Sequence, residues 1–381
     1  MTLSREVTPF LVMEILEEAQ RLERHGHDIV HFEVGEPDFD TPTCIKEAAR
    51  LGLAENETHY THSLGRRDLR EAICDYHARR YGATVSPDEV LATNGTSPAL
   101  CMLFAAILEP GDEVIIPDPY YAPYPNFIRF AGGVPVSVSC SPDDGYQLRA
   151  DAVRARITPR TKAILVNSPA NPTGAVLSSA TLAALCDLGP LVVSDEIYHG
   201  LTYVGEERSA LEFAGTDRVC VLNGFSKKYA MTGWRLGYAI ASTQVIRAMQ
   251  KLHQNFFISA SSFVQRAGIA ALREASADAE RMRAVYDERR RFMRARIEEA
   301  GLRVAVEPAG AFYVLLDARR FSTDSLSLAF DVLREAHVAT TPGVDFGRNA
   351  EGHLRLSYAT SFERIAAGVA RLGEYFAARH A

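Results

Sequence analysis

The chain has 381 residues, of which 47% are hydrophobic and 23% charged, and its formal net charge is −7. This composition is typical of a soluble globular protein, and the length predicts two domains, or one large domain with an appendage. An acidic chain lacks the basic face that neutralises phosphates, which excludes a general nucleic-acid binder. The basic run at 287–296 has apolar residues at helical spacing around it, so we interpret it as the solvated face of a helix.

The six cysteines are scattered and form no CxxC pair, which predicts reduced thiols and neither a disulfide framework nor a metal site. The first residues carry acids within their apolar pattern and lack the apolar core of a signal peptide. No apolar run approaches the roughly 20 residues that span a bilayer. We therefore expect a cytoplasmic protein without a membrane partner.

Short β-rich runs alternate with helical segments over the first two thirds of the chain. They lie at 89–93, 113–117, 134–139, 162–167, 191–194, 219–223 and 236–240. Continuous apolar strands separated by helices predict a mostly parallel sheet with helices on both faces.

After residue 275 the pattern changes to a long amphipathic helix that ends at Gly301, followed by strands at 311–316 and 353–358 between further helices. The predicted fold class is therefore α/β, a large domain with a mostly parallel sheet between helices plus a smaller α+β domain. We place the large domain at 41–280 and the small one at 281–381. We expect segment 1–40 to contribute to the small domain and to a lid.

Several predicted strands end at or just before polar residues, namely Asn167, Asp195 and Lys227. In open α/β sheets, ligands bind outside the carboxyl ends of the strands. The stretch "ATNGTSPAL" (92–100) reads as a strand, a glycine turn and the start of a helix, which suits a bound phosphate. Taken alone, "GTS" before a helix is more often an ordinary helix cap, since Ser and Thr are favoured there anyway. The chain contains neither a P-loop nor a GxGxxG motif.

Five motifs occur in order along nearly the whole chain, from Glu33 to Tyr358: "EVGEPDFDTP", "SPANPTG", "SDEIYHGL", "NGFSKKYAMTGWRLGY" and "GHLRLSYA". Together they resemble those of the class I/II aminotransferases, the pyridoxal-phosphate (PLP) enzymes of fold type I in the aspartate aminotransferase superfamily. The resemblance implies that PLP is the cofactor and that an amino group passes from an L-amino acid to a 2-oxo acid. It also implies that 41–280 is the PLP-binding domain.

The resemblance assigns the catalytic roles. Lys227, directly after Ser226, corresponds to the lysine that forms a Schiff base with the cofactor, and Lys228 has no assigned role. Asp195 corresponds to the carboxylate that keeps the pyridine nitrogen protonated, and Tyr198 corresponds to a residue that hydrogen-bonds the cofactor's 3-oxygen.

The resemblance also implies the remaining contacts with the cofactor. Asn171 would share the 3-oxygen, Tyr121 would stack on the pyridine ring, and Arg235 would grip the phosphate. Gly95, Thr96 and Ser97 would form a phosphate cup. Many family members carry a serine three residues before the lysine; here that position is Gly224, and Ser226 is expected to compensate. Tyr60 would reach the phosphate of the neighbouring subunit, which implies a homodimer.

For the substrate, the resemblance places Arg355, Gly35 and Asn171 around the α-carboxylate. Phe10, Tyr120 and Tyr124 are candidates for an apolar side-chain pocket and equally for plain core. The segment at 8–19 is placed to close over the site as a lid. No metal is expected.

Two other functions stay open at this point. A PLP-dependent lyase of the C–S β-lyase type would use the same residues. A non-catalytic PLP-binding regulator is disfavoured by the acidic chain and the complete set of site residues. The amino donor is left open, with 2-oxoglutarate as the expected acceptor.

Overall fold

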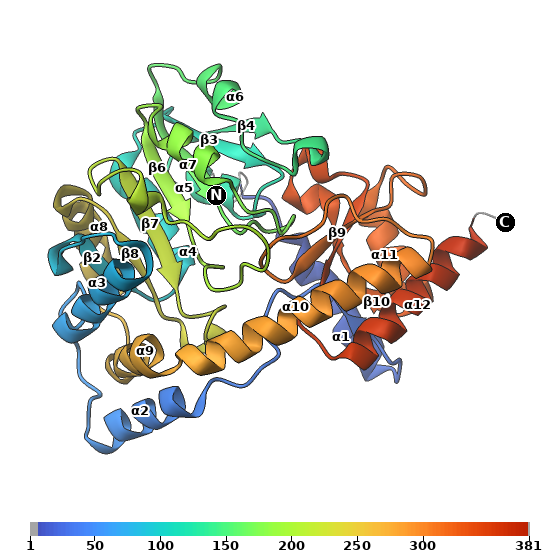
Figure 1. The fold of residues 1–381 in the computed structure, drawn as a ribbon, viewed down its shortest axis with the longest axis horizontal. Coiled ribbons are helices and arrows are strands. Elements are labelled where there is room, and N and C mark those ends of the chain that lie inside the picture. Colours follow the sequence, from blue (N-terminus) through green and yellow to red (C-terminus); the bar gives the residue numbers. More distant parts are fainter. Residues whose placement is uncertain (1–6, 380–381) are drawn as a thin grey trace.

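A seven-stranded sheet forms the centre of the larger part of the molecule (Figure 1). The computed structural model describes residues 7–379. The strand order is β2-β8-β7-β6-β5-β3-β4, and β8 alone runs antiparallel to its neighbours. The strands are β2 (Val90–Thr93), β3 (Glu113–Asp118), β4 (Val134–Ser139), β5 (Thr161–Asn167), β6 (Leu191–Asp195), β7 (Val219–Gly224) and β8 (Gly237–Ile240). The prediction of a mostly parallel sheet is confirmed, and each strand lies where the sequence pattern places it.

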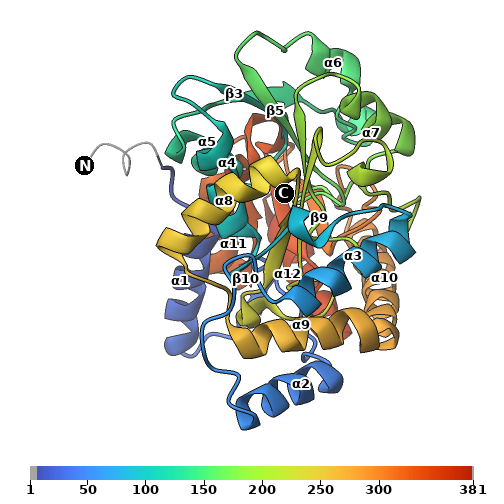
Figure 2. The same ribbon diagram turned by 90° about the vertical axis from the view of Figure 1, so that its left-hand side faces the viewer.

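Helices cover both faces of this sheet, because successive residues of each buried strand point to opposite sides. In β5, for example, Ile164 enters one apolar core and Leu165 the other. Figure 2 shows α5 and α8 on one side and α6 and α7 on the other. The helices of this part are α2 (Thr43–Ala54), α3 (Arg67–Tyr81), α4 (Thr96–Ile107), α5 (Tyr124–Phe130), α6 (Ala150–Arg154), α7 (Ser179–Cys186), α8 (Thr243–Phe256) and α9 (Ser262–Glu274).

The smaller part combines the two ends of the chain (Figure 1). Helix α10 (Ser276–Glu299) leads into it from the sheet part, and an antiparallel sheet follows with the order β11-β12-β9. From the other end of the chain, β1 pairs in parallel with β10. The elements are α1 (Leu11–Arg24), β1 (Val30–His31), β9 (Tyr313–Asp317), α11 (Ser325–Ala336), β10 (Val338–Ala339), β11 (Thr341–Pro342), β12 (His353–Ser357) and α12 (Phe362–Ala378). The pairing of β1 with β10 is what the predicted grouping of 1–40 with 281–381 requires, although the boundaries themselves stay a prediction.

The basic run at 287–296 lies within α10, but the interpretation as a solvated face is wrong for two of its members. Arg289 and Arg290 are buried. Arg289 Nη1 donates to Asp38 Oδ1 over 2.7 Å, and Arg290 Nη1 donates to Glu307 Oε1 over 2.7 Å. Helical periodicity predicted the helix but could not predict these distant carboxylates. Their ion pairs offset the desolvation cost of burying the two guanidinium groups.

None of the helices that the structure describes combines the length and the apolar composition needed to cross a membrane. All six cysteines are free. Within residues 7–379, no group of three His, Cys, Asp or Glu side chains lies together in a way that would hold a metal ion.

Candidate active site

A pocket of about 370 Å³ lies at the carboxyl end of the parallel strands. Asn167 ends β5 and Asp195 ends β6, and the two residues are direct partners in the strand register. Carboxyl ends of parallel strands meet at one edge of a sheet, which is why residues far apart in the sequence come together here. Helix α1 supplies the opposite wall, and Arg355 enters from β12.

Lys227 lies in the turn after β7, and its side chain lines this pocket. Its Nζ donates to the carbonyl of Gly35 over 2.6 Å. Burial, together with the positive charges of Arg355 and Arg235, lowers the pKa of Lys227 to about 8, against the opposing effect of Glu36 and Asp195. A fraction of this amine is therefore unprotonated near neutral pH, as a nucleophilic lysine requires.

Asp195 is buried at the base of the pocket. Tyr124 Oη donates to its Oδ2 over 2.7 Å, and the backbone N–H of Ile197 donates to its Oδ1 over 3.2 Å. Burial raises the pKa of Asp195 to about 6, in spite of these two hydrogen bonds and the positive charge of Lys227. Such a carboxyl group gains most from a cationic partner placed beside it.

Arg355 is buried in β12 and forms three hydrogen bonds. Its Nη1 donates to Asn171 Oδ1 over 2.9 Å, and its Nη2 donates to Thr341 Oγ1 over 3.1 Å and to the carbonyl of Glu33. The guanidinium lies over the ring of Tyr313, with its carbon 4.4 Å from the ring centroid. Its Nε has no hydrogen-bond partner among the described residues. Because no carboxylate lies within 4 Å of Arg355 in residues 7–379, the guanidinium remains available for an anionic group in the pocket.

Tyr198 also lines the pocket, and its hydroxyl forms a 2.7 Å hydrogen bond with that of Tyr313. Burial raises the pKa of both phenols, so both stay protonated. No motif predicted a role for Tyr313. An aromatic residue in an otherwise aliphatic strand is too common to indicate a site residue.

The residues predicted to form a phosphate cup lie at the start of α4. Gly95 precedes the helix with φ +102°, a conformation that favours glycine, and Thr96 is the first helical residue. A Cβ atom on Gly95 would lie 2.7 Å from Arg235 Nη2, so the guanidinium sits against this turn. Thr96 and Ser97 line the pocket. Free N–H groups at a helix start and an adjacent guanidinium form an anion-binding site.

The other predicted residues are placed as follows. Tyr121 lines the pocket, packed edge-on against Phe10 with 6.1 Å between ring centroids. Ser226 is buried next to Lys227. Tyr60 is 81% exposed and does not line the pocket of its own chain.

Gly224, where the chain departs from the family motif, lies at a close approach of β7 and β8. A Cβ there would lie 3.1 Å from the carbonyl oxygen of Leu236 and 3.2 Å from Gly237 Cα. A side chain at this position would therefore need the backbone of β8 to shift by a few tenths of an ångström.

Phe10, directly before α1, and Met13 and Leu16 within this helix present an apolar wall to the pocket. Of the two tyrosines considered for this wall, Tyr124 lines the pocket but directs its hydroxyl to Asp195, whereas Tyr120 lines a neighbouring small cavity. Helix α1 is attached at its start, where Leu11 N donates to Asp345 Oδ1 over 3.3 Å.

Comparison with known proteins identifies the class. Residues 27–372 match the family model "Aminotransferase class I and II". The chain therefore belongs to the class I and II aminotransferases, and it is an aminotransferase of fold type I.

Two curated relatives cover almost the whole chain. The aspartate/prephenate aminotransferase of Thermus thermophilus is 44% identical over 95% of this chain and 96% of its own. The (5-formylfuran-3-yl)methyl phosphate transaminase of Methanocaldococcus jannaschii is 39% identical over 96% of both chains. Among solved structures, aspartate aminotransferase from Thermus thermophilus with maleate superposes with a TM-score of 0.95, at 42% identity over 98% of both chains. These relatives are transaminases, so the lyase alternative is not favoured.

Proposed function

We propose that this protein is a PLP-dependent aminotransferase that transfers the amino group of an L-amino acid to a 2-oxo acid. The observation that carries the proposal is the convergence of a half-buried amine, a buried carboxyl group and a buried guanidinium on one pocket, in Lys227, Asp195 and Arg355. Each has the chemistry that one part of the reaction needs.

The residues present fit PLP. The turn at Gly95 and Arg235 would hold its phosphate, and Asp195 would pair with its pyridine nitrogen. Three of the five N–H groups of Arg355 are used within the protein, which leaves one on Nη1 and the one on Nε for a substrate carboxylate. When bound, the cofactor supplies an aldehyde for the amine and an electron-withdrawing ring.

The side chains would divide the work of proton transfer and orientation. Lys227 Nζ, with its lowered pKa, would take a proton from the substrate α-carbon. It would give a proton back at a later step of the same amino-group transfer. The carboxylate of Asp195 would stabilise positive charge at the base of the site, and Tyr198 with Asn171 would donate hydrogen bonds to the cofactor's 3-oxygen. Helix α1 would exclude water as a lid.

The donor is proposed to carry an apolar or aromatic side chain. Phe10, Met13 and Leu16 line the pocket, whereas Lys227 and Arg355 are its only Lys or Arg residues in the described part of the chain. An aspartate donor would bring a second carboxylate without a third cation to pair with it. For the acceptor we propose 2-oxoglutarate.

A half-reaction screen tests this proposal. The PLP form is mixed with each common amino acid while conversion to the pyridoxamine form and released ammonia are followed. Conversion without ammonia, fastest with apolar or aromatic donors, is the expected result. Ammonia and pyruvate from cysteine or cystathionine, without the pyridoxamine form, would show a lyase instead. Faster conversion with aspartate than with any apolar donor would overturn the donor class alone.

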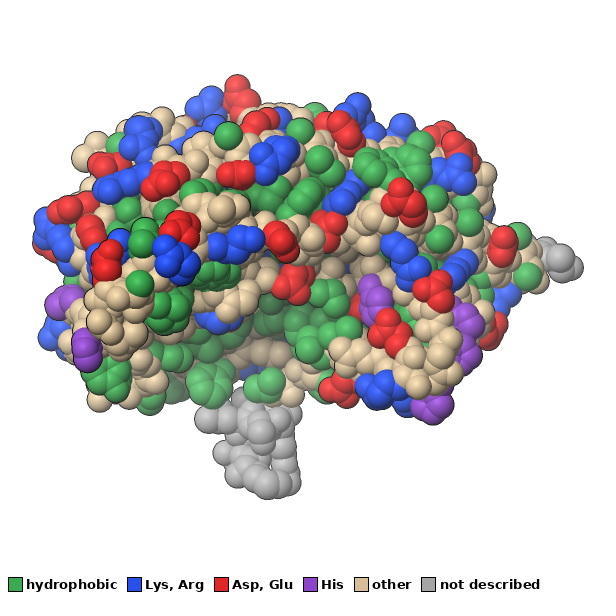
Figure 3. All heavy atoms as spheres, turned by 90° about the horizontal axis from the view of Figure 1, so that it is seen from below, with side chains coloured by type: hydrophobic (Ala, Val, Ile, Leu, Met, Phe, Trp, Pro, Cys, Tyr) green, Lys and Arg blue, Asp and Glu red, His purple; other side chains and the backbone are tan. Residues whose placement is uncertain are grey.

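We further propose a cytoplasmic homodimer in which Tyr60 of each chain contributes to the partner's phosphate site. Large apolar side chains are exposed, among them Tyr60 at 81%, Phe256 at 72% and Ile258 at 45%. Apolar side chains gather at the lower left and centre of Figure 3, whereas charges of both signs are spread over the upper edge. Ile258 adopts φ +67°, which is strained for a β-branched residue and is a feature of functional segments. Sedimentation of an active monomer at working concentration would refute the dimer.

The proposed domain division is 1–40 with 281–381 in the small domain, and 41–280 as the PLP-binding domain. Limited proteolysis with mass determination tests the first boundary, because residue 40 lies between β1 and α2, outside any helix or strand, and cleavage is expected there before it occurs within either part. The second boundary lies within α10, where a continuous helix resists cleavage.

A further inference from the structure

Tyr313 lies between the substrate side and the cofactor side of the candidate active site, although no motif assigns it a role. It is the first residue of β9, it is buried, and its side chain lines the pocket. In the register of the antiparallel sheet, Tyr313 pairs with Ser357 of β12. Arg355 stands two residues before Ser357, so it lies on the same face of the sheet, diagonally opposite the tyrosine. The sheet thus brings these two side chains together.

The ring of Tyr313 supports the guanidinium of Arg355. The guanidinium carbon lies 4.4 Å from the centroid of the Tyr313 ring and 5.0 Å from that of the Phe346 ring. Two aromatic rings this close restrict the plane of the guanidinium and attract its charge. Because a guanidinium binds a carboxylate through two parallel hydrogen bonds, the orientation of its plane decides how well it does so.

The hydroxyl of Tyr313 has a partner on the cofactor side of the pocket. It forms a 2.7 Å hydrogen bond with the hydroxyl of Tyr198, and both side chains are buried. A Cβ atom on Gly35 would overlap Tyr313 Oη, so the backbone of this glycine packs directly against the hydroxyl. The glycine therefore leaves room for the phenol and restricts its movement away from Tyr198.

The direction of this hydrogen bond follows from the protons that the two phenols can offer. A phenol has one O–H to donate and can also accept. If Tyr198 gives its proton to the 3-oxygen of PLP, as the proposed function requires, then only Tyr313 can be the donor between the two hydroxyls. Hydrogen bonds arranged in such a chain polarise one another, so donation by Tyr313 makes Tyr198 a stronger donor.

We propose that Tyr313 is a positioning residue for both sides of the site: its hydroxyl strengthens the donation from Tyr198 to the cofactor, and its ring orients Arg355 for the substrate carboxylate. This inference rests on the proposed function, because it requires bound PLP. A hydrogen bond from Tyr198 stabilises negative charge on the 3-oxygen, which then holds less tightly the proton that it shares with the nitrogen of Lys227. Loss of the Tyr313 hydroxyl should therefore raise the pH at which this proton leaves.

The test is a pH titration of the visible absorption band of the protein loaded with PLP. Tyr313→Phe removes the hydroxyl and keeps the ring. Tyr358→Phe is the matched control, because Tyr358 is also buried and donates to the carbonyl of Ala311 over 3.2 Å, but does not line the pocket. Tyr313→Leu, which removes the ring as well, is compared with Tyr313→Phe in steady-state kinetics at varied amino-acid concentration.

The midpoint of the titration should rise by at least about 0.5 pH unit in Tyr313→Phe and stay unchanged in Tyr358→Phe. An unchanged midpoint in Tyr313→Phe would overturn the proposal. A lower midpoint would also overturn it, because Tyr198 would then be the donor to Tyr313 and its proton would be released for the cofactor.

KM for the amino acid should change less than about threefold in Tyr313→Phe and rise at least about tenfold in Tyr313→Leu, since only the second variant loses the ring beside the guanidinium. Equal KM values in the two variants would overturn the role of the ring.

Failure of this inference and failure of the proposed function give different results. A parent protein whose visible band does not change with pH would refute the proposed function, and this inference with it. A parent band that titrates, together with an unmoved midpoint in Tyr313→Phe, would refute the inference alone.

Discussion

Tyr124 and Asp195 are joined by a 2.7 Å hydrogen bond at the base of the candidate active site, and both side chains are buried. The phenol donates to the carboxylate, so it stabilises the charged form of a group that burial pushes toward neutrality. Because burial raises the pKa of Tyr124 well above its ordinary value, the donor keeps its proton at any working pH.

The Tyr124→Phe substitution removes this donor. We expect the pKa of Asp195 to rise further above about 6, and kcat to fall about tenfold or more, the effect of losing one hydrogen bond to a charged group. The pKa is measured in the cofactor-free protein from the pH dependence of urea unfolding. Tyr120→Phe is the control, because Tyr120 lines the neighbouring small cavity. Equal effects of the two substitutions would show that the hydrogen bond is unimportant.

Asp195 should destabilise the protein when no cofactor is present. Its pKa in the folded protein, about 6, lies above the ordinary 3.8, so the folded state binds the proton more tightly than the unfolded state. The free energy of unfolding should therefore fall as pH rises from about 4 to about 6, by ~3 kcal/mol from this group. Asp195→Asn removes this loss.

The cofactor-free Asp195→Asn protein should be more stable than the parent at pH 8 and equally stable at pH 4, while most of its activity is lost. Urea unfolding at the two pH values measures the difference. If the variant were less stable than the parent at pH 8, the carboxylate would already have a favourable partner in the cofactor-free protein.

Lys227 and Lys228 should behave differently toward PLP. Borohydride reduction should attach the cofactor to Lys227, since its amine lines the pocket and its pKa is about 8. Lys227→Ala should abolish turnover but still bind PLP through the phosphate. Lys228→Met should retain the attachment. Peptide mapping after reduction identifies the labelled lysine. A label on Lys228 would contradict the assignment of Lys227.

Arg355→Lys should weaken the binding of the substrate carboxylate. A lysine keeps the charge but loses the planar fork that also contacts Asn171 over 2.9 Å. We expect KM for the amino acid to rise about a hundredfold, the order expected for two charge-assisted hydrogen bonds. Steady-state kinetics at varied amino-acid concentration measure the change. A primary amine without a carboxylate should react equally with both proteins; a loss with that amine too would indicate general damage to the site.

Asp38 and Arg289 should stabilise the attachment of α10 to the N-terminal segment. The guanidinium is 9% exposed and lies 2.7 Å from the Asp38 carboxylate. Asp38→Asn leaves this cation without its ion partner, and we expect a loss of about 2 kcal/mol in the free energy of unfolding. Denaturant unfolding measures it. The double variant Asp38→Asn with Arg289→Met should recover part of this loss. If the loss in the double variant equalled the sum of the losses in the two single variants, the pair would not interact.

The sequence by itself determined the alternation of elements and the local chemistry of the site. Apolar runs such as 162–167 and 219–223 are predictable as strands, because they are short and rich in residues that fit a pleated, buried surface. The edge at which Asn167 and Asp195 meet follows from the parallel topology that this alternation predicts. Motif resemblance then pointed to Lys227, Asp195 and Arg355, which the structure brings into one pocket.

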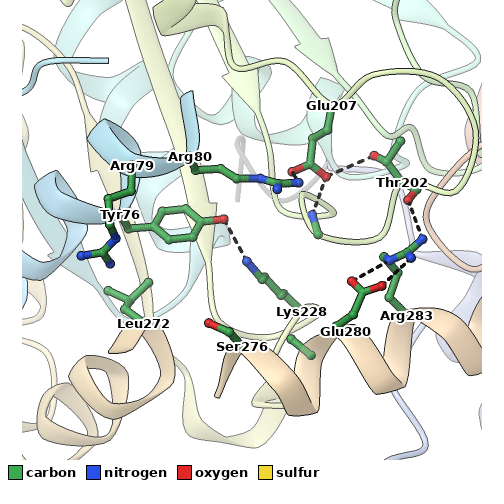
Figure 4. A pocket seen from close by; sticks show the side chains of 12 residues that line it. Tyr76, Arg79, Arg80, Thr202, Glu207, Lys228, Leu272, Ser276, Glu280 and Arg283 are labelled. Carbon is green, nitrogen blue, oxygen red and sulfur yellow. Dashed lines mark hydrogen bonds and ion pairs between the residues drawn. The ribbon is translucent and has the colours of Figure 1, made fainter. Parts of the chain in front are cut away.

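Only the tertiary structure decided which distant groups meet. The hydrogen bonds of Tyr124 with Asp195 and of Tyr198 with Tyr313 span 71 and 115 residues, and no local pattern encodes them. Arg289 and Lys228 both resemble surface cations in the sequence, but residues of other elements fix their positions. Arg289 pairs with Asp38, whereas Lys228 packs across Gly200 and donates to Tyr76 (Figure 4). Local propensity depends on neighbours a few residues away, whereas burial, pKa and pairing depend on contacts that exist only once the chain has folded.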